Sequence, residues 1–136
     1  MKSWFAITLS ILTIAWMGTI PAVAGQKPDS GVPKYDAAAE ATFNGTVVDV
    51  IDRQCPMSGG LGSHLMLKQA DGSTIEVHLA TTKFVKNFDL IFNKGDKVEV
   101  DGVKVNFEGK ETLFAREVTR GSETFVFRDK NGVPIW

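Results

Sequence analysis

The sequence predicts a small all-β barrel with one short helix, and three observations lead to that fold class. Runs rich in Val, Ile, Phe and Thr alternate with polar residues at the period of a strand. Glycine-containing turns separate the runs at Asp71-Gly72, Glu108-Gly109 and Arg120-Gly121. Residues 81–92 combine a helix cap with helical spacing. Many short strands with one helix are typical of a closed barrel rather than of a β-sandwich.

The first 24 residues have the layout of a secretory signal peptide. Lys2 supplies a positive charge, residues 4–20 are mostly apolar, and Ala22-Val23-Ala24 is the small-x-small pattern of a cleavage site. The sequence therefore predicts a signal peptide over residues 1–24, a periplasmic or secreted location, and no membrane span after cleavage. A retained leader would instead act as a membrane anchor; Pro21 favours cleavage.

The rest of the chain is long enough for one small domain and no more. Removing Lys2 from the totals leaves 14 basic and 16 acidic residues, a formal charge of −2. A chain this close to neutral has no electrostatic footprint for nucleic acid or for an anionic membrane. One cysteine cannot form an internal disulfide, so stability must come from the core and from hydrogen bonds.

Residues 25–40 predict a flexible N-terminal tail, because they are polar and contain several Gly and Pro residues. Three alanines within residues 35–40 predict one helical turn that leads into the fold. The barrel domain then occupies residues 41–136. Its first strand, residues 41–52, is rich in Val, and Gly45 within it predicts a bulge or a sharp bend.

A loop and a β-hairpin come next, and they hold the only cysteine and both histidines of the chain. Residues 53–63 contain three glycines and a proline, which predicts a loop. Two short strands then flank Asp71-Gly72, which is a strong hairpin signal.

The apolar alternation predicts a register for this hairpin. Leu65 and Leu67 must share a buried face with the apolar residues of the second strand, because a slip of one residue would expose one set. This pairs Leu65 with Leu79 and Leu67 with Val77 around a three-residue turn. On the opposite face it places Lys68 across from Glu76, Met66 across from His78, and His64 diagonal to His78.

A short helix follows the hairpin. Thr81 or Thr82 provides its N-cap, and the polar run Asn93-Lys94-Gly95-Asp96 ends it. Its apolar residues lie on one helical face: Phe84, Val85, Phe88 and Phe92.

The second half of the chain predicts two further strands and a hairpin. Residues 98–107 form a long strand whose alternation changes phase at Asp101-Gly102, which predicts the bulge that bends a strand around a barrel. Residues 112–119 form the fifth strand, and residues 124–127 add a C-terminal hairpin. This order, with a helix between the third and fourth strands, predicts a five-stranded OB-fold Greek-key barrel plus the hairpin.

Several motifs make residues 43–136 resemble a group of small exported bacterial OB-fold proteins. The motifs are Gly45-Thr46-Val47, His64-Leu65, Glu76-Val77-His78-Leu79, Lys94-Gly95-Asp96-Lys97-Val98-Glu99-Val100, Ala115-Arg116-Glu117-Val118, and the ending Arg128-Asp129 with Gly132, Pro134 and Trp136. The resemblance covers nearly all of the chain after the leader. It implies an exported OB barrel and no particular reaction.

The chain also resembles, more loosely, the periplasmic copper and silver chaperones that are built on an OB barrel. Those proteins bind a monovalent metal ion through one histidine and two methionines, with a tryptophan beside the metal. The resemblance implies such roles for Met57, Met66 and either His64 or His78. The family's methionine spacing is absent here, and its tryptophan has no counterpart because Trp136 lies at the far end of the chain.

Five residues around the hairpin have side chains that suit a soft metal ion. They are Cys55, Met57, His64, Met66 and His78. Thiolate, thioether and imidazole together suit Cu(I) or Ag(I). Each residue also has an ordinary interpretation: the methionines fill the barrel surface, the histidines are solvated or bind the loop, and the thiol is buried and inert.

The sequence thus predicts an exported OB-fold binding or accessory protein of the bacterial envelope. Its ligand face lies on the second and third strands and the preceding loop, and its partner is an envelope protein or a small ligand. Binding of Cu(I) or Ag(I) is the alternative function. Single-stranded nucleic-acid binding is less expected, because the chain is slightly acidic and its phenylalanines have the spacing of core residues.

No enzyme activity is expected. A catalytic Cys55 would need a base within hydrogen-bond reach and an oxyanion pocket, and no nucleophile motif surrounds it. The carboxylates are scattered along the chain, and Glu76 is interpreted with the others as part of a solvated outer face.

Overall fold

The computed structural model describes residues 31–136. The predicted signal peptide, residues 1–24, lies outside this range, as does the first part of the predicted tail. Both therefore stay predictions. Within residues 31–136, no helix has the length and apolar character needed to cross a membrane.

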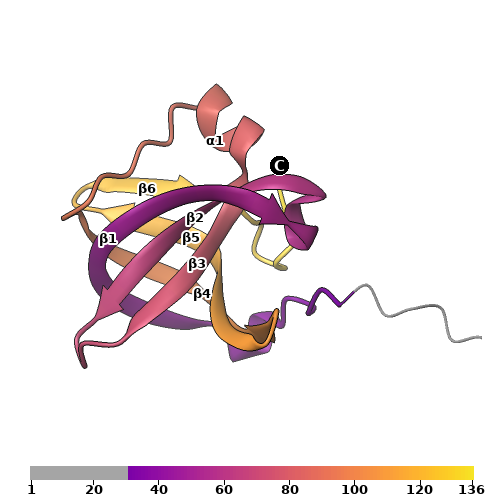
Figure 1. Ribbon diagram of the computed structural model, residues 1–136, viewed down its shortest axis with the longest axis horizontal. Coiled ribbons are helices and arrows are strands. Elements are labelled where there is room, and N and C mark those ends of the chain that lie inside the picture. Colours follow the sequence, from indigo (N-terminus) through magenta and orange to yellow (C-terminus); the bar gives the residue numbers. More distant parts are fainter. Residues whose placement is uncertain (1–30) are drawn as a thin grey trace, which may run out of the picture.

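Six β-strands, two 3-10 turns and one α-helix make up this part of the chain (Figure 1). The strands are β1 (Ala41–Cys55), β2 (Gly60–Gln69), β3 (Thr74–Thr81), β4 (Lys97–Phe107), β5 (Lys110–Arg120) and β6 (Glu123–Val126). The 3-10 turns are η1 (Ala37–Ala39) and η2 (Pro56–Ser58), and the helix is α1 (Thr82–Asn87). The turn η1 confirms the predicted helical turn ahead of the first strand.

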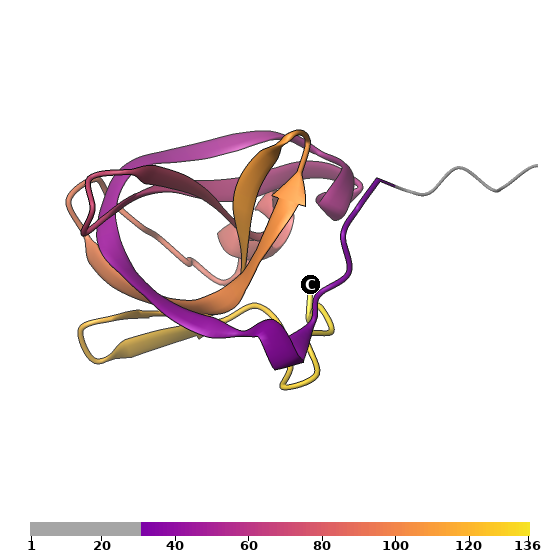
Figure 2. The ribbon, with the colours of Figure 1, turned by 90° about the horizontal axis from the view of Figure 1, so that it is seen from below.

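Five of the strands close into a barrel, which Figure 2 shows end-on. Neighbouring strands follow the order β3-β2-β1-β4-β5, and a parallel pairing between β3 and β5 closes the ring. The remaining pairings are antiparallel, and α1 lies between β3 and β4 in the chain. This is the arrangement of an OB-fold barrel. The strand β6 pairs with β5 as a C-terminal hairpin, so the predicted fold class is confirmed.

The first strand is long because it takes part in both halves of the barrel. Its beginning pairs with β4, the rest pairs with β2, and the two pairings overlap at Gly45 and Thr46. A Cβ atom on Gly45 would lie 2.6 Å from Cγ of Leu67, so only glycine allows this close approach. The bulge of β1 lies between Val47 and Asp49, a short distance beyond the glycine at which it was predicted.

The β2–β3 hairpin has its predicted buried face but a different register. Leu65 lies opposite Val77 instead of Leu79, and the other predicted pairs are shifted in the same way. The turn explains the shift. Gly72 has a φ of +86°, which places it last in a three-residue turn over residues 70–72, as expected for a hairpin with one left-handed residue.

On the other face of the hairpin, the shift brings the two histidines together. His64 lies opposite His78, and Met66 lies opposite Glu76. The predicted pairs of Met66 with His78 and of Lys68 with Glu76 are therefore wrong. The observed partner of each residue lies two positions from the predicted partner. Because side chains alternate between the faces with a period of two, this shift changes the cross-strand partners and leaves the two faces as predicted.

Most of the predicted loop over residues 53–63 is regular structure. The strand β1 continues to Cys55, the turn η2 follows at once, and β2 begins at Gly60. Gly59, with a φ of +64°, ends η2 and reverses the chain tightly enough for Cys55 to pair with Gly60.

The helix is shorter than predicted. Thr81 is its N-cap and accepts a hydrogen bond from the backbone N–H of Phe84 at 3.2 Å. The helix ends at Asn87, so Phe88 stands just after it and is 64% exposed, while Phe92 is buried outside the helix. The predicted apolar face therefore holds only for the first part of this segment.

The bulge predicted in β4 is confirmed between Asp101 and Gly102. A Cβ atom on Gly102 would overlap the carbonyl oxygen of Phe114 in the neighbouring strand. Glycine at this point therefore allows the strand to bend around the barrel.

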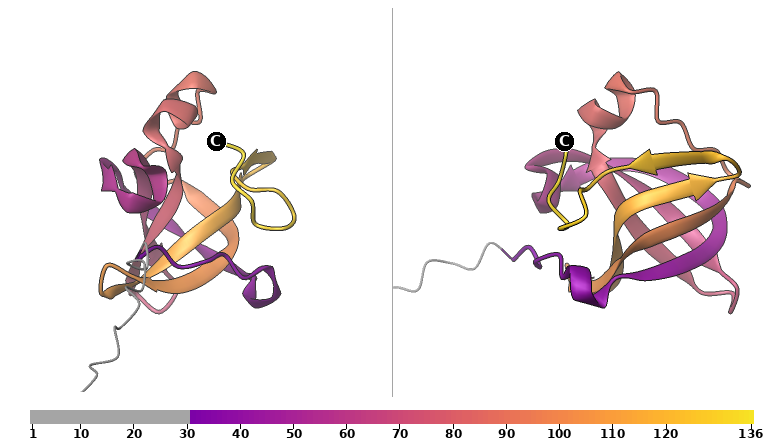
Figure 3. Two further views of the ribbon diagram at one scale, coloured as in Figure 1. Left: turned by 90° about the vertical axis from the view of Figure 1, so that its right-hand side faces the viewer. Right: turned by 180° about the vertical axis from the view of Figure 1, so that it is seen from behind.

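Two hydrophobic cores are separated by the barrel wall. The main core is inside the barrel and includes Leu65, Leu67, Val77, Val100 and Leu113. The second core consists of Cys55, Phe107 and Phe114, with Val32, Tyr35, Met57 and Val105 packed against it. Figures 1 and 3 show the N-terminal segment, η2 and the C-terminal segment on the same side of the barrel.

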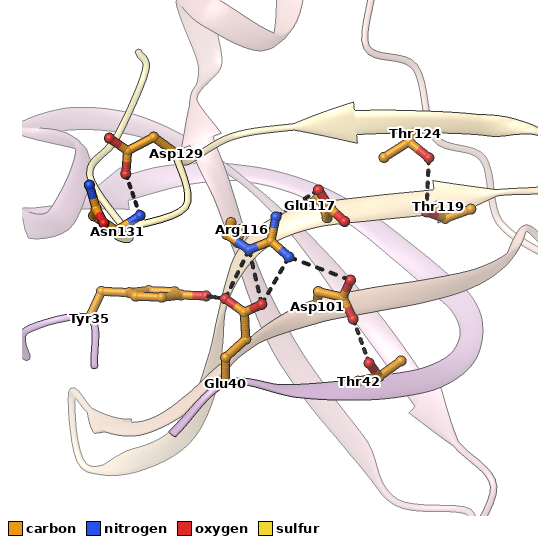
Figure 4. Close-up of polar contacts among 10 residues, drawn as sticks. All are labelled: Tyr35, Glu40, Thr42, Asp101, Arg116, Glu117, Thr119, Thr124, Asp129 and Asn131. Carbon is orange, nitrogen blue, oxygen red and sulfur yellow. Dashed lines mark hydrogen bonds and ion pairs between the residues drawn. The ribbon is translucent and has the colours of Figure 1, made fainter. Parts of the chain in front are cut away.

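A polar network fixes the N-terminal segment to the barrel (Figure 4). Arg116 of β5 binds the carboxylate of Glu40 at 2.9 Å and contacts Asp101 of β4. The hydroxyl of Tyr35 donates to Glu40 at 2.5 Å. Burial, together with this hydrogen bond, raises the pKa of Tyr35 above its ordinary range. The network holds Tyr35 over the second core.

Candidate metal centre

Three metal-ligating side chains from three different strands converge beside the second core. Cys55 is the last residue of β1, His64 lies in β2, and His78 lies in β3. One donor atom from each residue lies within 4.8 Å of the other two. All three residues are buried, and both histidines are 0% exposed. These three belong to the five residues that the sequence singled out.

Strand pairing directs the two imidazoles at each other. His64 and His78 are partners across β2 and β3, with ring centroids 4.9 Å apart and ring planes at 89°. A β-bulge between Ser63 and His64 shifts the pairing at this point. Bulges of this kind often re-aim side chains beside functional sites. The tight turn η2 then brings Cys55 back over the start of β2.

The missing side chain of Gly62 marks the point of convergence. A Cβ atom on Gly62 would lie 2.5 Å from Oγ of Ser58, 3.1 Å from Cβ of Cys55 and 3.1 Å from Nε2 of His64. Side chains from η2, β1 and β2 therefore border the space that this glycine leaves open. Any larger residue at this position would enter it.

The donor spacing is close to that of a bound metal ion. With metal–sulfur and metal–nitrogen bonds of about 2.3 and 2.0 Å, donors on one ion lie about 3.3–3.8 Å apart. The separations here are at most 4.8 Å. An inward movement of about 1 Å would therefore be enough to complete the coordination.

A buried carboxylate lies against one of the histidines. Oε1 of Glu76 lies 2.8 Å from Nδ1 of His64, as a close contact without the alignment of a hydrogen bond. Arg53 binds the same oxygen at 2.7 Å, and Lys110 binds the second oxygen. Burial alone would raise the pKa of Glu76, but the hydrogen bonds from Lys110 and Arg53 lower it below its ordinary value. The prediction of a solvated Glu76 is wrong, since the residue is 3% exposed.

This arrangement leaves Nε2 of His64 directed at the donor group. Carboxylates commonly orient metal-binding histidines through the nitrogen that does not bind the metal. Nε2 has no hydrogen-bond partner among residues 31–136, and the same is true of Nδ1 of His78. Buried polar atoms without a partner are rare in proteins and call for an explanation such as a bound ion.

Ser58 completes the polar surroundings of the donors. Its hydroxyl lies 2.9 Å from Nε2 of His78. Ser58 is the last residue of η2, and Cys55 immediately precedes this turn, so the end of β1 supplies the sulfur and η2 supplies the hydroxyl. This role could not be predicted from the sequence, because a serine in a glycine-rich segment is usually a turn residue.

Burial keeps both imidazoles neutral. It lowers the pKa of His64 to about 4, with the nearby Arg53 acting in the same direction and Glu76 against it. It lowers the pKa of His78 to about 3, and the charges of His64 and Arg128 add to the effect. A neutral imidazole is the form that binds metal ions.

Trp136 lies beside the donors, although it is the last residue of the chain. Its ring centroid is 5.7 Å from that of His78, and the ring of Phe114 is 5.9 Å from His78 on another side. The sequence offers no counterpart of the copper chaperones' tryptophan, because Trp136 lies at the far end of the chain, but the fold brings Trp136 next to His78. A bridge between Arg128 and Pro134 folds the C-terminal segment back on itself, and the backbone N–H groups of Phe127 and Arg128 donate to the carbonyl of Arg116 in β5.

The two predicted methionines are placed differently from the three donors. Met57 packs against the second core next to Cys55, and its sulfur accepts a hydrogen bond from Nη2 of Arg128 at 3.7 Å. Met66 lies opposite Glu76, two residue pairs beyond the two histidines. Ligation by either methionine stays a prediction.

A surface hollow reaches the edge of the centre. It has a volume of about 410 Å³ and is lined by Gln54, Cys55, Pro56, Gly59, Gly60 and Glu108. Cys55 is only 2% exposed, so the hollow borders its backbone and leaves the donors covered.

One family of proteins matches most of the barrel. The MamS/MamX magnetosome protein family matches residues 39–125, which is more than half of the chain. The chain belongs to the MamS/MamX magnetosome protein family. The three donors of this MamS/MamX protein lie inside the matched range, whereas Arg128 and Trp136 lie beyond it.

Other comparisons add little to this membership of the MamS/MamX family. No match was found among curated proteins. Among solved structures, the chain is similar to the mitochondrial single-stranded DNA binding protein Rim1 of S. cerevisiae. The identity is 14% and the TM-score is 0.41, over 65% of this chain and 96% of that chain. A similarity this low carries no argument about the ligand.

Proposed function

We propose that this MamS/MamX protein is an exported OB-barrel protein of the magnetosome that binds one soft metal ion through Cys55, His64 and His78. The observation that supports the proposal is the convergence of three buried donors from three strands, with ring nitrogens that lack a partner among residues 31–136. The family's description supports the magnetosome location, and the predicted leader supports export.

The donor set favours a soft ion. One thiolate and two neutral imidazoles suit Cu(I), and Ag(I) shares that preference for sulfur and nitrogen. Zn(II) also binds cysteine and histidine, usually with four donors. Ser58 or a water molecule would be the fourth donor for zinc, whereas Cu(I) and Ag(I) need no more than the three residues. The predicted ions Cu(I) and Ag(I) therefore remain the preferred occupants.

Burial separates this metal function from cysteine catalysis. The site resembles a catalytic triad in its residue types, with Glu76 beside His64, and His64 near Cys55. In such a triad the carboxylate orients the histidine, the histidine acts as the base and the cysteine is the nucleophile. However, Cys55 is only 2% exposed and His64 is 0% exposed, so a substrate cannot reach the sulfur. An ion needs only a narrow path. We therefore infer a binding site and no catalytic role for Cys55.

The test is an anaerobic titration of the reduced, purified protein with Ag(I) and with Cu(I). One equivalent should bind and change the tryptophan fluorescence, because Trp136 lies next to His78. The variants Cys55→Ser, His64→Gln and His78→Gln should each lose more affinity than the about 10–100-fold typical of an outer-shell change. Met66→Leu is the matched control, since it alters a neighbouring residue on the same strand.

Two results would contradict the proposal. One is the absence of a stoichiometric complex with either ion in the wild-type protein. The other is a loss of affinity in Met66→Leu as large as that in the donor variants, which would assign the ion to a different set of ligands. Circular dichroism of each variant shows whether the barrel is intact.

A further inference from the structure

Arg128 is a buried cation beside the metal centre. The residue is 3% exposed. Its guanidinium lies among the rings of Tyr35, Phe114 and Trp136, at 5.2–5.8 Å from their centroids. Within residues 31–136 no carboxylate pairs with it, and its Nε has no hydrogen-bond partner. Because an arginine stays charged in proteins, this is a positive charge without a counterion in the described part of the chain.

This charge is close to His78 and to the turn that follows Cys55. Two of the rings around Arg128, those of Phe114 and Trp136, also lie against His78. Nη2 of Arg128 contacts the sulfur of Met57, which stands two residues after Cys55. A single layer of aromatic rings therefore separates the guanidinium from His78.

The other charges around the centre do not offset Arg128. Glu76 is the carboxylate in contact with a donor, and it is already paired with Arg53 and Lys110. Metal binding deprotonates the thiol, which adds one negative charge at Cys55. A monovalent ion then forms a neutral unit with the thiolate, whereas a divalent ion leaves an extra positive charge next to Arg128.

We propose that Arg128 determines the charge selectivity of the centre, favouring a monovalent ion such as Ag(I) or Cu(I) over a divalent ion such as Zn(II). The proposal rests on the proposed metal function and adds a specificity-determining residue to it. Repulsion scales with the charge of the ion, so Arg128 opposes Zn(II) twice as strongly as Ag(I). At the effective dielectric constant of a protein, repulsion between two unit charges that are separated by one aromatic ring lowers the affinity for the ion about tenfold or more.

The experiment compares the ratio of the Zn(II) and Ag(I) dissociation constants in wild-type protein, Arg128→Met and Arg128→Lys. The ratio is informative because damage to the donor geometry weakens the binding of both ions, whereas loss of the charge at Arg128 changes the binding of the two ions by different amounts. Arg128→Met removes the charge and should lower the ratio about tenfold or more. A lysine buried here without a counterion loses its proton readily, so Arg128→Lys should lower the ratio in the same direction as Arg128→Met.

A second variant covers the case in which Arg128→Met does not fold. Tyr35 is half-buried and its ring lies 5.2 Å from the guanidinium, so Tyr35→Glu would place a counterion there while Arg128 stays in position. It should also lower the ratio. The proposal is overturned if both ions bind and the folded variant keeps the wild-type ratio. Failure of the wild-type protein to bind either ion would instead refute the metal function itself, and this inference with it.

Discussion

At the scale of single residues, Gly62 is the position on which the centre depends most. A methyl group there would meet Ser58 at 2.5 Å and crowd both Cys55 and His64. We expect Gly62→Ala to lower Ag(I) affinity at least tenfold and to cost about 1–3 kcal/mol of unfolding free energy through overpacking. Gly60→Ala is the control, because the same strand has open space around Gly60. Titration and urea unfolding of both variants test this, and equal affinity in the two would show that the donors do not use this space.

The residues of the centre were only partly predictable from the sequence. Cys55, His64 and His78 stand out because their chemistry is rare in a short chain. Glu76 and Ser58 carry no such signal, since a carboxylate on a strand and a serine in a turn are usually solvated. Their role depends on contacts with Arg53 and His78 that only the folded chain creates.

At the scale of elements, the hairpin shows what a pattern can predict and what it cannot. Alternation predicted which residues of β2 and β3 face the barrel, because that depends on a period of two. The cross-strand partners depend on the turn, where the left-handed Gly72 moved the register. The error mattered, because the true register pairs His64 directly with His78.

The turn can be weakened without disturbing the metal centre. Gly72 has a φ of +86°, so Gly72→Ala should cost about 1–2 kcal/mol of unfolding free energy. The turn lies roughly 20 Å along the strands from the histidines, at about 3.3 Å per residue. Ag(I) affinity should therefore stay within about threefold of wild type. Urea unfolding with Lys68→Ala as an exposed control checks the first expectation. A large loss of metal affinity would mean that the whole hairpin, rather than its far end, positions the donors.

At the scale of the whole molecule, the chain covers one outer face of its own barrel. The N-terminal segment with Tyr35 and the C-terminal segment with Arg128 and Trp136 lie over β3 and β5. An outer strand face normally meets water, which is why the sequence indicated a solvated His78. No local pattern shows that distant segments return to bury it. This covering leaves two strand histidines buried and neutral.

The same burial makes stability depend on pH. In the unfolded chain both histidines take up protons near pH 6.5, while the folded rings do so only near pH 4 and 3. The unfolded state therefore binds more protons below pH 6.5, and stability, complete above that value, falls as the pH drops. Between pH 7 and 5, each histidine should lower the free energy of unfolding by about 2 kcal/mol. The pKa of Glu76 is lowered from 4.5, so its contribution is lost only at lower pH.

Urea unfolding in the presence of a chelator measures the slope of stability against pH, and His78→Gln should roughly halve that slope. A wild-type slope near zero between pH 7 and 5 would show that water reaches the rings, and the case for a covered metal centre would then fail.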